Sequence, residues 1–468
     1  IVHGNSRAED FSDPGFAYLG ELLASRGFIV ASIDENFLNT NLIDSAGGLT
    51  GVNAARGWLL LEHLRVWHAW NNESGNPFHN RIDTANIALI GHSRGGEAVA
   101  VAAAFNTLER FPDDPNVVFD YGYAIRSIIA IAPSDAQYVP LGEKLALQNI
   151  NYLVLQGSHD ADVFSFVGLN QYHRTTFSPE TDWIKAAVYI YRANHGHFNS
   201  TWDAYDLGEG LSARLIDTAA LLPAEEQRKA AQVFVAAFLE TTLHSAATYR
   251  PFFRDVHVGR AWQPDTVYIS QYADATTNYL STYEEDVSVT SATLTGGTQL
   301  GAGLIQWQEE HLLLRGGPGD DRVVRLGWQP NTGPEAPRYT ITLPAEGITR
   351  DAGSVLRFDM ADLVSRADSQ LTNLTIEVRD ADGTSARLPL SHVAPLQPPI
   401  EGRYLKSAFF HDTPLSDPIP QTFSFPLGDF AAANPAFDPA TLTSIAFVFD
   451  GTPAGTILLD NVGVAAGE

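Results

Sequence analysis

The stretch 86–105, "NIALIGHSRGGEAVAVAAAF", decides how the first half of this chain is interpreted. An apolar run ends at Gly91, Ser93 follows two residues later, and an alanine-rich segment comes next. The pattern predicts a buried strand, a tight turn and a helix, which is the context of a nucleophile elbow. We expect Gly91, His92 and Gly95 to form this turn and Ser93 to project its Oγ above the sheet. The alternative is a glycine-rich connection in which Ser93 is an ordinary helix N-cap.

A catalytic serine needs a base and an acid that orients the base. After a nucleophile elbow the acid comes next in the chain and the histidine comes last. The predicted strand 152–160 ends at Asp160, and the predicted strand 185–195 ends at His195. Ser93, Asp160 and His195 thus follow three strands in the required order, which predicts a catalytic triad.

Rival residues remain open at two of these positions. Asp162 or Asp135 can replace Asp160 as the acid, and His197 can replace His195 as the base. The His195-x-His197 pair also resembles part of a metal site, but no third ligand stands at metal-site spacing. We therefore expect no metal ion in the reaction.

The same pattern indicates two donors for an oxyanion. The N–H of Arg94 begins the predicted helix directly after Ser93, at the point where an oxyanion would form. The stretch "VHGN" reads as a strand that ends before a loop, and enzymes with this elbow place their second donor there. We expect the N–H of Asn5 to supply it.

The sequence pattern changes near residue 262. Residues 1–262 alternate short apolar strands with longer amphipathic helices, which predicts an α/β domain with a mainly parallel sheet flanked by helices. The expected strands are 1–4, 28–34, 86–92, 127–135, 152–160 and 185–195, and the expected helices are 15–27, 52–70, 95–110 and 223–243. Residues 263–468 contain many short strands separated by turn residues, which predicts an all-β sandwich of jelly-roll type.

Composition excludes several classes of function. The chain has 468 residues, no cysteine, 29 Lys and Arg, and 55 Asp and Glu, giving a net charge of −26. Such an acidic surface repels phosphates, so we expect no nucleic-acid partner, and no apolar run is long enough to span a membrane. The sequence contains no signal-peptide pattern. It begins with "IVHGN", which reads as mid-strand, and we expect the first strands of the sheet to be missing.

These motifs resemble the α/β-hydrolase superfamily, and "GHSRGG" resembles its chlorophyllase and platelet-activating-factor acetylhydrolase-like branch. The wider pattern is similar to exported bacterial serine esterases of that branch, through "HGN", "VASIDENFLN", "AARGWLLLEHLRVW", "HDADV" and "ANHGHFNSTW". The resemblance covers about residues 1–250. It implies ester hydrolysis through an acyl-enzyme without a metal or organic cofactor, His195 as the base, and a secreted or cell-envelope location.

The last strands, "LTSIAFVFDGTPAGTILLDNVGV", resemble galactose-binding or carbohydrate-binding modules. That resemblance implies a glycan or polymer surface as a partner and a structural calcium ion to which Asp460 contributes. The stretches "GGPGDD" (316–321) and "RDADGT" (379–384) are single copies, and we interpret them as hairpin turns rather than calcium loops.

We therefore predict a serine hydrolase that cleaves carboxylic esters. A lipase-like or cutinase-like enzyme and a polyester-degrading enzyme are narrower variants of this prediction. A peptidase or amidase with the same triad is the second hypothesis. A binding protein built on an inactive hydrolase fold is the third.

Overall fold

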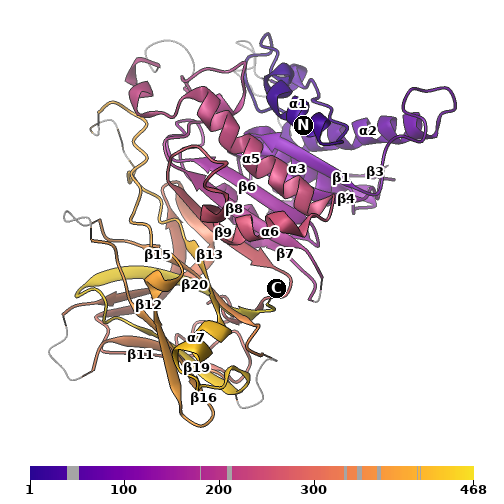
Figure 1. Cartoon of the computed structure of the whole chain (residues 1–468). Helices are drawn as coiled ribbons and strands as arrows, with labels where there is room; N and C mark the ends of the chain where they lie inside the picture. Colours follow the sequence, from indigo (N-terminus) through magenta and orange to yellow (C-terminus); the bar gives the residue numbers. More distant parts are fainter. Residues whose placement is uncertain are drawn as a thin grey trace. The chain divides into compact units, whose positions relative to one another are not determined.

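The structure is a computed structural model in which the chain forms two compact units (Figure 1). It describes residues 1–39, 52–179, 181–207, 213–330, 335–344, 350–365, 370–407, 409, 411 and 413–467. The first unit contains residues 1–178, 183–268 and 402–415, and the second contains residues 179–182, 269–401 and 416–468.

A parallel sheet lies at the centre of the first unit. Its neighbouring strands run in the order β1, β4, β6, β8, and each of these pairs is parallel. Every residue of β6 is buried, as expected for a strand covered on both faces. The bounds are β1 Ile87–His92, β4 Ile125–Ile131, β6 Asn151–Gly157 and β8 Ile184–Ile190. The predicted α/β class with a parallel sheet is confirmed.

Helices pack in pairs around this sheet. Helix α1 contacts α5 and α2 contacts α3, while α3 also contacts β1 and β4, and α5 contacts β4 and β6. Gly27, at φ +92°, follows the last turn of α1 and takes the left-handed conformation that glycine favours at a helix end. The bounds are α1 Ala17–Ser25, α2 Val52–Asn72, α3 Arg94–Phe105, α4 Gly168–Arg174, α5 Ala224–Thr242 and α6 Arg250–Arg254.

Two predicted elements differ from the structure, and two short strand pairs occur that the sequence pattern does not predict. The predicted strand 28–34 forms no ladder: Ile33 makes an isolated bridge with Val2, and Val2 in turn bridges Gly91. The predicted helix 95–110 ends at Phe105, because the Asn106 side chain accepts the backbone N–H groups of residues 122 and 123 and turns the chain. The short antiparallel pair β2 (Arg110–Phe111) and β3 (Asp114–Val118) follows. A second short pair, which is parallel, joins β5 (Leu147–Gln148) and β7 (Thr175–Thr176).

Strands β6 and β8 also end earlier than predicted. Because β6 ends at Gly157 and β8 at Ile190, Asp160 and His195 lie in the loops that follow these strands. Both loops still leave the carboxyl edge of the parallel sheet, where ligands of open α/β sheets bind.

The second unit is a sandwich of two antiparallel sheets. One has the order β12, β13, β20, β15, β18, with β10 paired to β20, and the other has the order β11, β14, β19, β16, β17. Val324 and Phe358 from the first sheet and Tyr339, Ile341 and Phe447 from the second meet in one buried core. The strand bounds are β10 Asn278–Ser281, β11 Thr298–Ala302, β12 Gln306–Leu314, β13 Gly317–Trp328, β14 Arg338–Thr342, β15 Val355–Asp362, β16 Thr375–Asp380, β17 Ser385–Pro389, β18 Gln421–Pro426, β19 Leu442–Val448 and β20 Gly455–Ala465. Helix α7 spans Leu427–Ala433, and β9, Tyr268–Asp274, begins where the first unit ends.

Residues 402–415 return to the first unit from the later part of the chain. Leu405 forms an antiparallel bridge with Ile216, and the two side chains pack in a buried cluster with Ala161, the residue after Asp160. The sequence pattern does not indicate this return, and a boundary at residues 262–263 stays a prediction.

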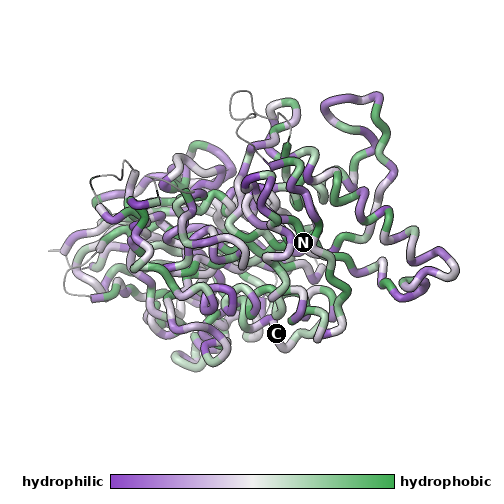
Figure 2. Tube along the Cα trace, turned by 90° about the horizontal axis from the view of Figure 1, so that it is seen from above, coloured by the Kyte–Doolittle hydropathy of each residue, from purple (hydrophilic) through white to green (hydrophobic). Residues whose placement is uncertain are grey.

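Within the described ranges no helix is long and apolar enough to cross a membrane. Figure 2 shows hydrophobic and hydrophilic residues interspersed along the chain.

Candidate active site

Ser93 occupies a strained turn between β1 and α3. Its backbone has φ +58° and ψ −127°, a conformation that few residues other than glycine adopt. A Cβ on Gly91 would lie 2.0 Å from the carbonyl oxygen of Gly95, and a Cβ on Gly95 would lie 2.6 Å from that of Val2. The glycines around Ser93 therefore permit backbone contacts that any side chain would prevent.

One predicted oxyanion donor, Arg94, directly follows Ser93, and the other, Asn5, follows Gly4, which adjoins Ser93. A Cβ on Gly4 would lie 2.9 Å from Ser93 Oγ, and Asn5 follows Gly4 in the chain. Arg94 is the first residue of α3, where a helix N–H has no acceptor within the helix. The oxyanion roles of Asn5 and Arg94 stay predictions.

A buried network anchors the loop that contains Gly4. His3 Nδ1 lies 2.7 Å from the Gly4 carbonyl oxygen, and His3 Nε2 accepts the backbone N–H of Glu35 at 2.9 Å. The Glu35 carboxylate pairs with Arg56 at 3.2 Å, and both side chains are fully buried. Burial raises the pKa of Glu35 to about 8, although the charge of Arg56 opposes the shift.

Asp160 and His195 are joined directly. His195 Nδ1 lies 2.8 Å from Asp160 Oδ2, and both side chains are buried. Asp160 Oδ1 accepts the backbone N–H groups of Asp162 at 2.9 Å and Val163 at 2.7 Å. Gln156 Nε2 donates to Asp160 Oδ2 at 3.1 Å. The acid thus holds its own turn with one oxygen and the imidazole with the other.

The other ring nitrogen of His195 has no hydrogen-bond partner within the described part of the chain, although Asp162 Oδ2 lies 3.4 Å from it. Burial lowers the pKa of His195, but the carboxylates of Asp160 and Asp162 outweigh burial and raise it above the ordinary histidine value. Burial raises the pKa of Asp160. His195 thus binds its proton more tightly than a free histidine.

The rival residues occupy other positions. Asp162 is half-exposed and contacts the opposite nitrogen of His195 from Asp160. Asp135 is paired with Arg174 and also accepts a hydrogen bond from Asn170 at 3.2 Å. Burial, and to a smaller extent the charge of Arg228, lowers the pKa of His197. Of the two acids that follow β6, Asp160 makes the bond that orients the imidazole.

Aromatic contacts connect the serine turn to the histidine. The ring of His92, directly before Ser93, lies 4.6 Å from the ring of His195, measured between centroids. Trp202 lies 4.9 Å from His92 and 6.0 Å from His195 in the same measure. Burial lowers the pKa of His92 well below its usual value, and the ring packs as an aromatic group. The structure thus brings together the turn of Ser93, His195 and Asp160.

One residue near the site has no sequence signal. Asp206 accepts backbone hydrogen bonds from Ala161 and His195, which belong to two different loops. It stands in a loop without a motif, and its partners are separated from it by 11 and 45 residues in the chain.

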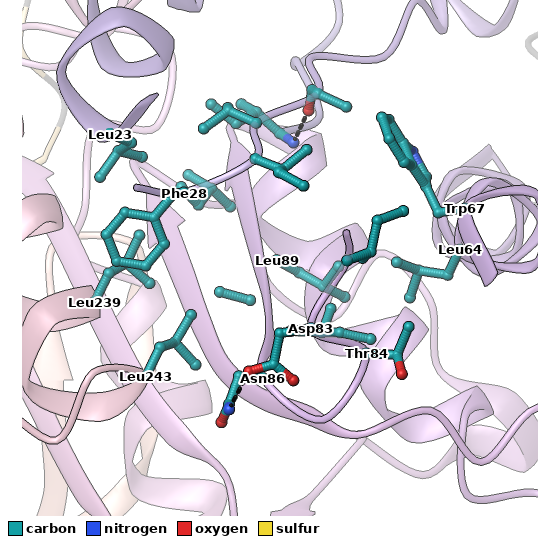
Figure 3. Close-up of a pocket in the computed structure, with 18 of the residues that line it drawn as sticks. Leu23, Phe28, Leu64, Trp67, Asp83, Thr84, Asn86, Leu89, Leu239 and Leu243 are labelled. Carbon is teal, nitrogen blue, oxygen red and sulfur yellow. Dashed lines mark hydrogen bonds between the residues drawn. The ribbon is translucent and has the colours of Figure 1, made fainter. Parts of the chain in front are cut away.

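A cavity of about 310 Å³ lies elsewhere in the first unit (Figure 3). Its lining is largely apolar and includes Phe28, Leu64, Trp67, Leu89 and Leu239. None of the predicted site residues lines this cavity, so it is separate from the loops that hold Ser93, Asp160 and His195.

Comparisons with known proteins identify partial relatives. No protein-family model matches the chain. Over 80 residues, 17% of this chain, it is 34% identical to Cutinase 2 of Thermobifida cellulosilytica and 35% identical to Cutinase est1 of Thermobifida alba. A cutinase of Thermobifida fusca is 34% identical over the same length. The matched region spans 25%, 22% and 21% of these relatives, respectively.

Among solved structures, the family 30 carbohydrate-binding module of a Clostridium thermocellum cellulosomal cellulase aligns with 36% of this chain and 91% of its own. The identity is 14% and the TM-score is 0.24, which is too low to support an inference about fold or ligand. The chain is thus similar, over 80 residues, to enzymes of the cutinase type.

Proposed function

We propose that this protein is a serine hydrolase that cleaves carboxylic esters through an acyl-enzyme, with Ser93 as nucleophile, His195 as base and Asp160 as orienting acid. The observation that carries the proposal is the 2.8 Å bond between His195 Nδ1 and Asp160, beside a serine in a strained strand–helix turn. The partial similarity to cutinases supports the same class of reaction.

In the proposed reaction His195 Nε2 takes the proton of Ser93 as Oγ attacks the ester carbonyl carbon. The tetrahedral oxyanion is stabilised by the N–H groups of Asn5 and Arg94. The imidazolium then gives its proton to the leaving alcohol as the carbon–oxygen bond breaks, which leaves an acyl-serine. Water, deprotonated by His195, attacks the acyl group; the acid leaves and Ser93 regains its proton.

In the neutral imidazole, Asp160 holds the tautomer in which Nδ1 carries the proton and Nε2 is free to accept one. Asp162 adds a second negative charge near the same ring and so stabilises the imidazolium. The neutral imidazole, which acts as the base, therefore forms at higher pH. The reaction requires neither a metal ion nor an organic cofactor.

Because the partial relatives are cutinases, we propose polymeric esters as substrates alongside soluble ones. An amide substrate would use the same groups. The ratio of rates on an ester and an amide with the same acyl group separates an esterase from a peptidase or amidase.

For the second unit we propose a glycan or polymer surface as partner and a structural calcium ion near Asp460. Asp460 is buried on β20, and burial followed by the charges of Asp321 and Asp359 raises its pKa. Carboxylate oxygens are the ligands that Ca²⁺ prefers. A calcium-dependent rise in melting temperature that is lost in Asp460→Asn is expected; an unchanged melting temperature would contradict it.

Secretion or a cell-envelope location stays a proposal.

The proposed activity is tested with a short p-nitrophenyl ester and a fluorophosphonate probe. Wild-type protein is expected to turn over the ester and to be labelled on Ser93, whereas Ser93→Ala is expected to do neither. Ser25→Ala is the matched control, because Ser25 lies exposed at the end of α1. Full activity of Ser93→Ala would refute the assignment, and an unlabelled, inactive wild-type protein would favour the binding-protein hypothesis. Full-length protein is required, because residues 402–415 belong to the first unit.

A further inference from the structure

Asp206 connects the two loops that carry the proposed acid and base. Its Oδ2 accepts the backbone N–H groups of Ala161 and His195, each at 3.0 Å. Its Oδ1 accepts the side-chain amide of Asn194 at 2.8 Å and the backbone N–H of Gly196 at 2.9 Å. One carboxylate therefore holds three consecutive residues of the His195 loop and the residue directly after Asp160.

We infer that Asp206 is a positioning residue of the active site, which fixes the Asp160 loop relative to the His195 loop and so maintains the bond between their side chains. The inference rests on the proposed function for its effect on turnover, and on the hydrogen bonds alone for its effect on geometry. Asp206 itself bonds the backbone of His195 and not its ring, so it acts through the two residues that it places.

The chemistry of Asp206 explains why a carboxylate is required here. Each of its two oxygens accepts two N–H donors. In asparagine one oxygen is replaced by an NH₂ group, which cannot accept the two N–H groups that face it. Burial raises the pKa of Asp206 to about 7, and the charge of Asp160 adds to this shift. Burying a carboxylate costs free energy unless its oxygens accept hydrogen bonds, and these four donors supply them.

Asp206 differs in this from its neighbour Asp203. Asp203 is exposed and its Oδ1 accepts the N–H of Tyr205 at 2.7 Å, which closes a local turn. The two aspartates lie in the same segment, and Asn substitution changes each by the same charge and size. Asp203→Asn is thus a matched control for Asp206→Asn.

Both variants are compared with the wild-type full chain on a short p-nitrophenyl ester, across the pH range, so that a change in the His195 pKa is separated from a loss of alignment. Asp206→Asn is expected to lower the plateau kcat by roughly 10- to 100-fold, since small misplacements of catalytic groups have effects of this size. KM is expected to stay within about twofold, because Asp206 bonds loop backbone rather than substrate. Asp203→Asn is expected to match the wild type in both constants.

A proton NMR measurement tests the geometry without any turnover. The proton shared between His195 Nδ1 and Asp160 gives a downfield resonance, identified by its loss in His195→Gln. It is expected to shift or broaden in Asp206→Asn and to be unchanged in Asp203→Asn. A folded Asp206→Asn with wild-type kcat and an unchanged resonance would overturn the inference.

A weaker variant covers the case in which Asp206→Asn does not fold. Asn194→Ala removes one of the four bonds to Asp206 and is expected to move the same resonance and to lower kcat by a smaller factor. An unmoved resonance in folded Asn194→Ala, together with wild-type kcat, would then reject the inference. If the wild-type protein has no esterase activity, the proposed function fails, and the resonance alone decides on the role of Asp206.

Discussion

Gly4 and Ser93 lie so close that a Cβ atom on Gly4 would come within 2.4 Å of the Ser93 Cβ. Only glycine fits at this position, since real Cβ atoms do not approach other carbons so closely. Gly4→Ala must push the Gly4 loop or the serine turn away, and either movement would misplace the proposed Asn5 donor relative to Ser93. We expect a loss in kcat of roughly 100-fold, measured on a p-nitrophenyl ester.

Gly20→Ala is the control for this substitution. A Cβ on Gly20 would meet nothing closer than a Val30 methyl group at 3.9 Å, so this variant is expected to keep full activity. Equal activities of the two variants would show that the Gly4 loop is not part of the site.

Asp162 is expected to set the pH at which His195 becomes a base. Its carboxylate lies 3.4 Å from His195 Nε2 and favours the imidazolium, which cannot accept the proton of Ser93. Asp162→Asn should lower the pKa of His195, and the rise of kcat/KM with pH should move to lower pH by roughly 0.5–1 unit. The exposed Asp120 precedes the amino end of β4, at the other edge of the sheet, so Asp120→Asn is the control. A shift to higher pH in Asp162→Asn would contradict this electrostatic role.

The pair Glu35–Arg56 is expected to be critical for stability. Arg56→Met leaves the Glu35 carboxylate buried without its counter-charge, and we expect the free energy of unfolding to fall by about 3–5 kcal/mol. Urea denaturation measures this loss. The Glu62–Arg65 pair has a similar length, 3.0 Å, but is largely exposed, so Arg65→Met should cost at most about 1 kcal/mol. Similar losses in both variants would mean that burial of the ion pair is not decisive.

The strand–turn–helix around Ser93 was predictable because it rests on local signals, namely an apolar run, closely spaced glycines and an alanine-rich helix. The order of Asp160 and His195 was predictable for the same reason, since each follows an apolar strand. Asp206 was not, because its hydrogen bonds reach backbone groups of loops that no periodicity identifies. The return of residues 402–415 to the first unit likewise depends on a tertiary contact of Leu405 that no sequence pattern indicates.

Replacement of Ser93 by glycine is expected to stabilise the protein relative to replacement by alanine. At φ +58° and ψ −127° an alanine keeps the backbone strain, whereas glycine relieves it. We expect the free energy of unfolding of Ser93→Gly to exceed that of Ser93→Ala by about 1 kcal/mol in urea denaturation. Both variants should lack esterase activity. A lower stability of Ser93→Gly would show that the turn is relaxed rather than strained.

The strained turn has a consequence for laboratory evolution of this protein. Selection for heat resistance alone would enrich glycine at position 93, because the residue that relaxes the backbone is not the proposed nucleophile. Libraries of this chain therefore need a turnover screen in every round, or they converge on well-folded proteins without a nucleophile.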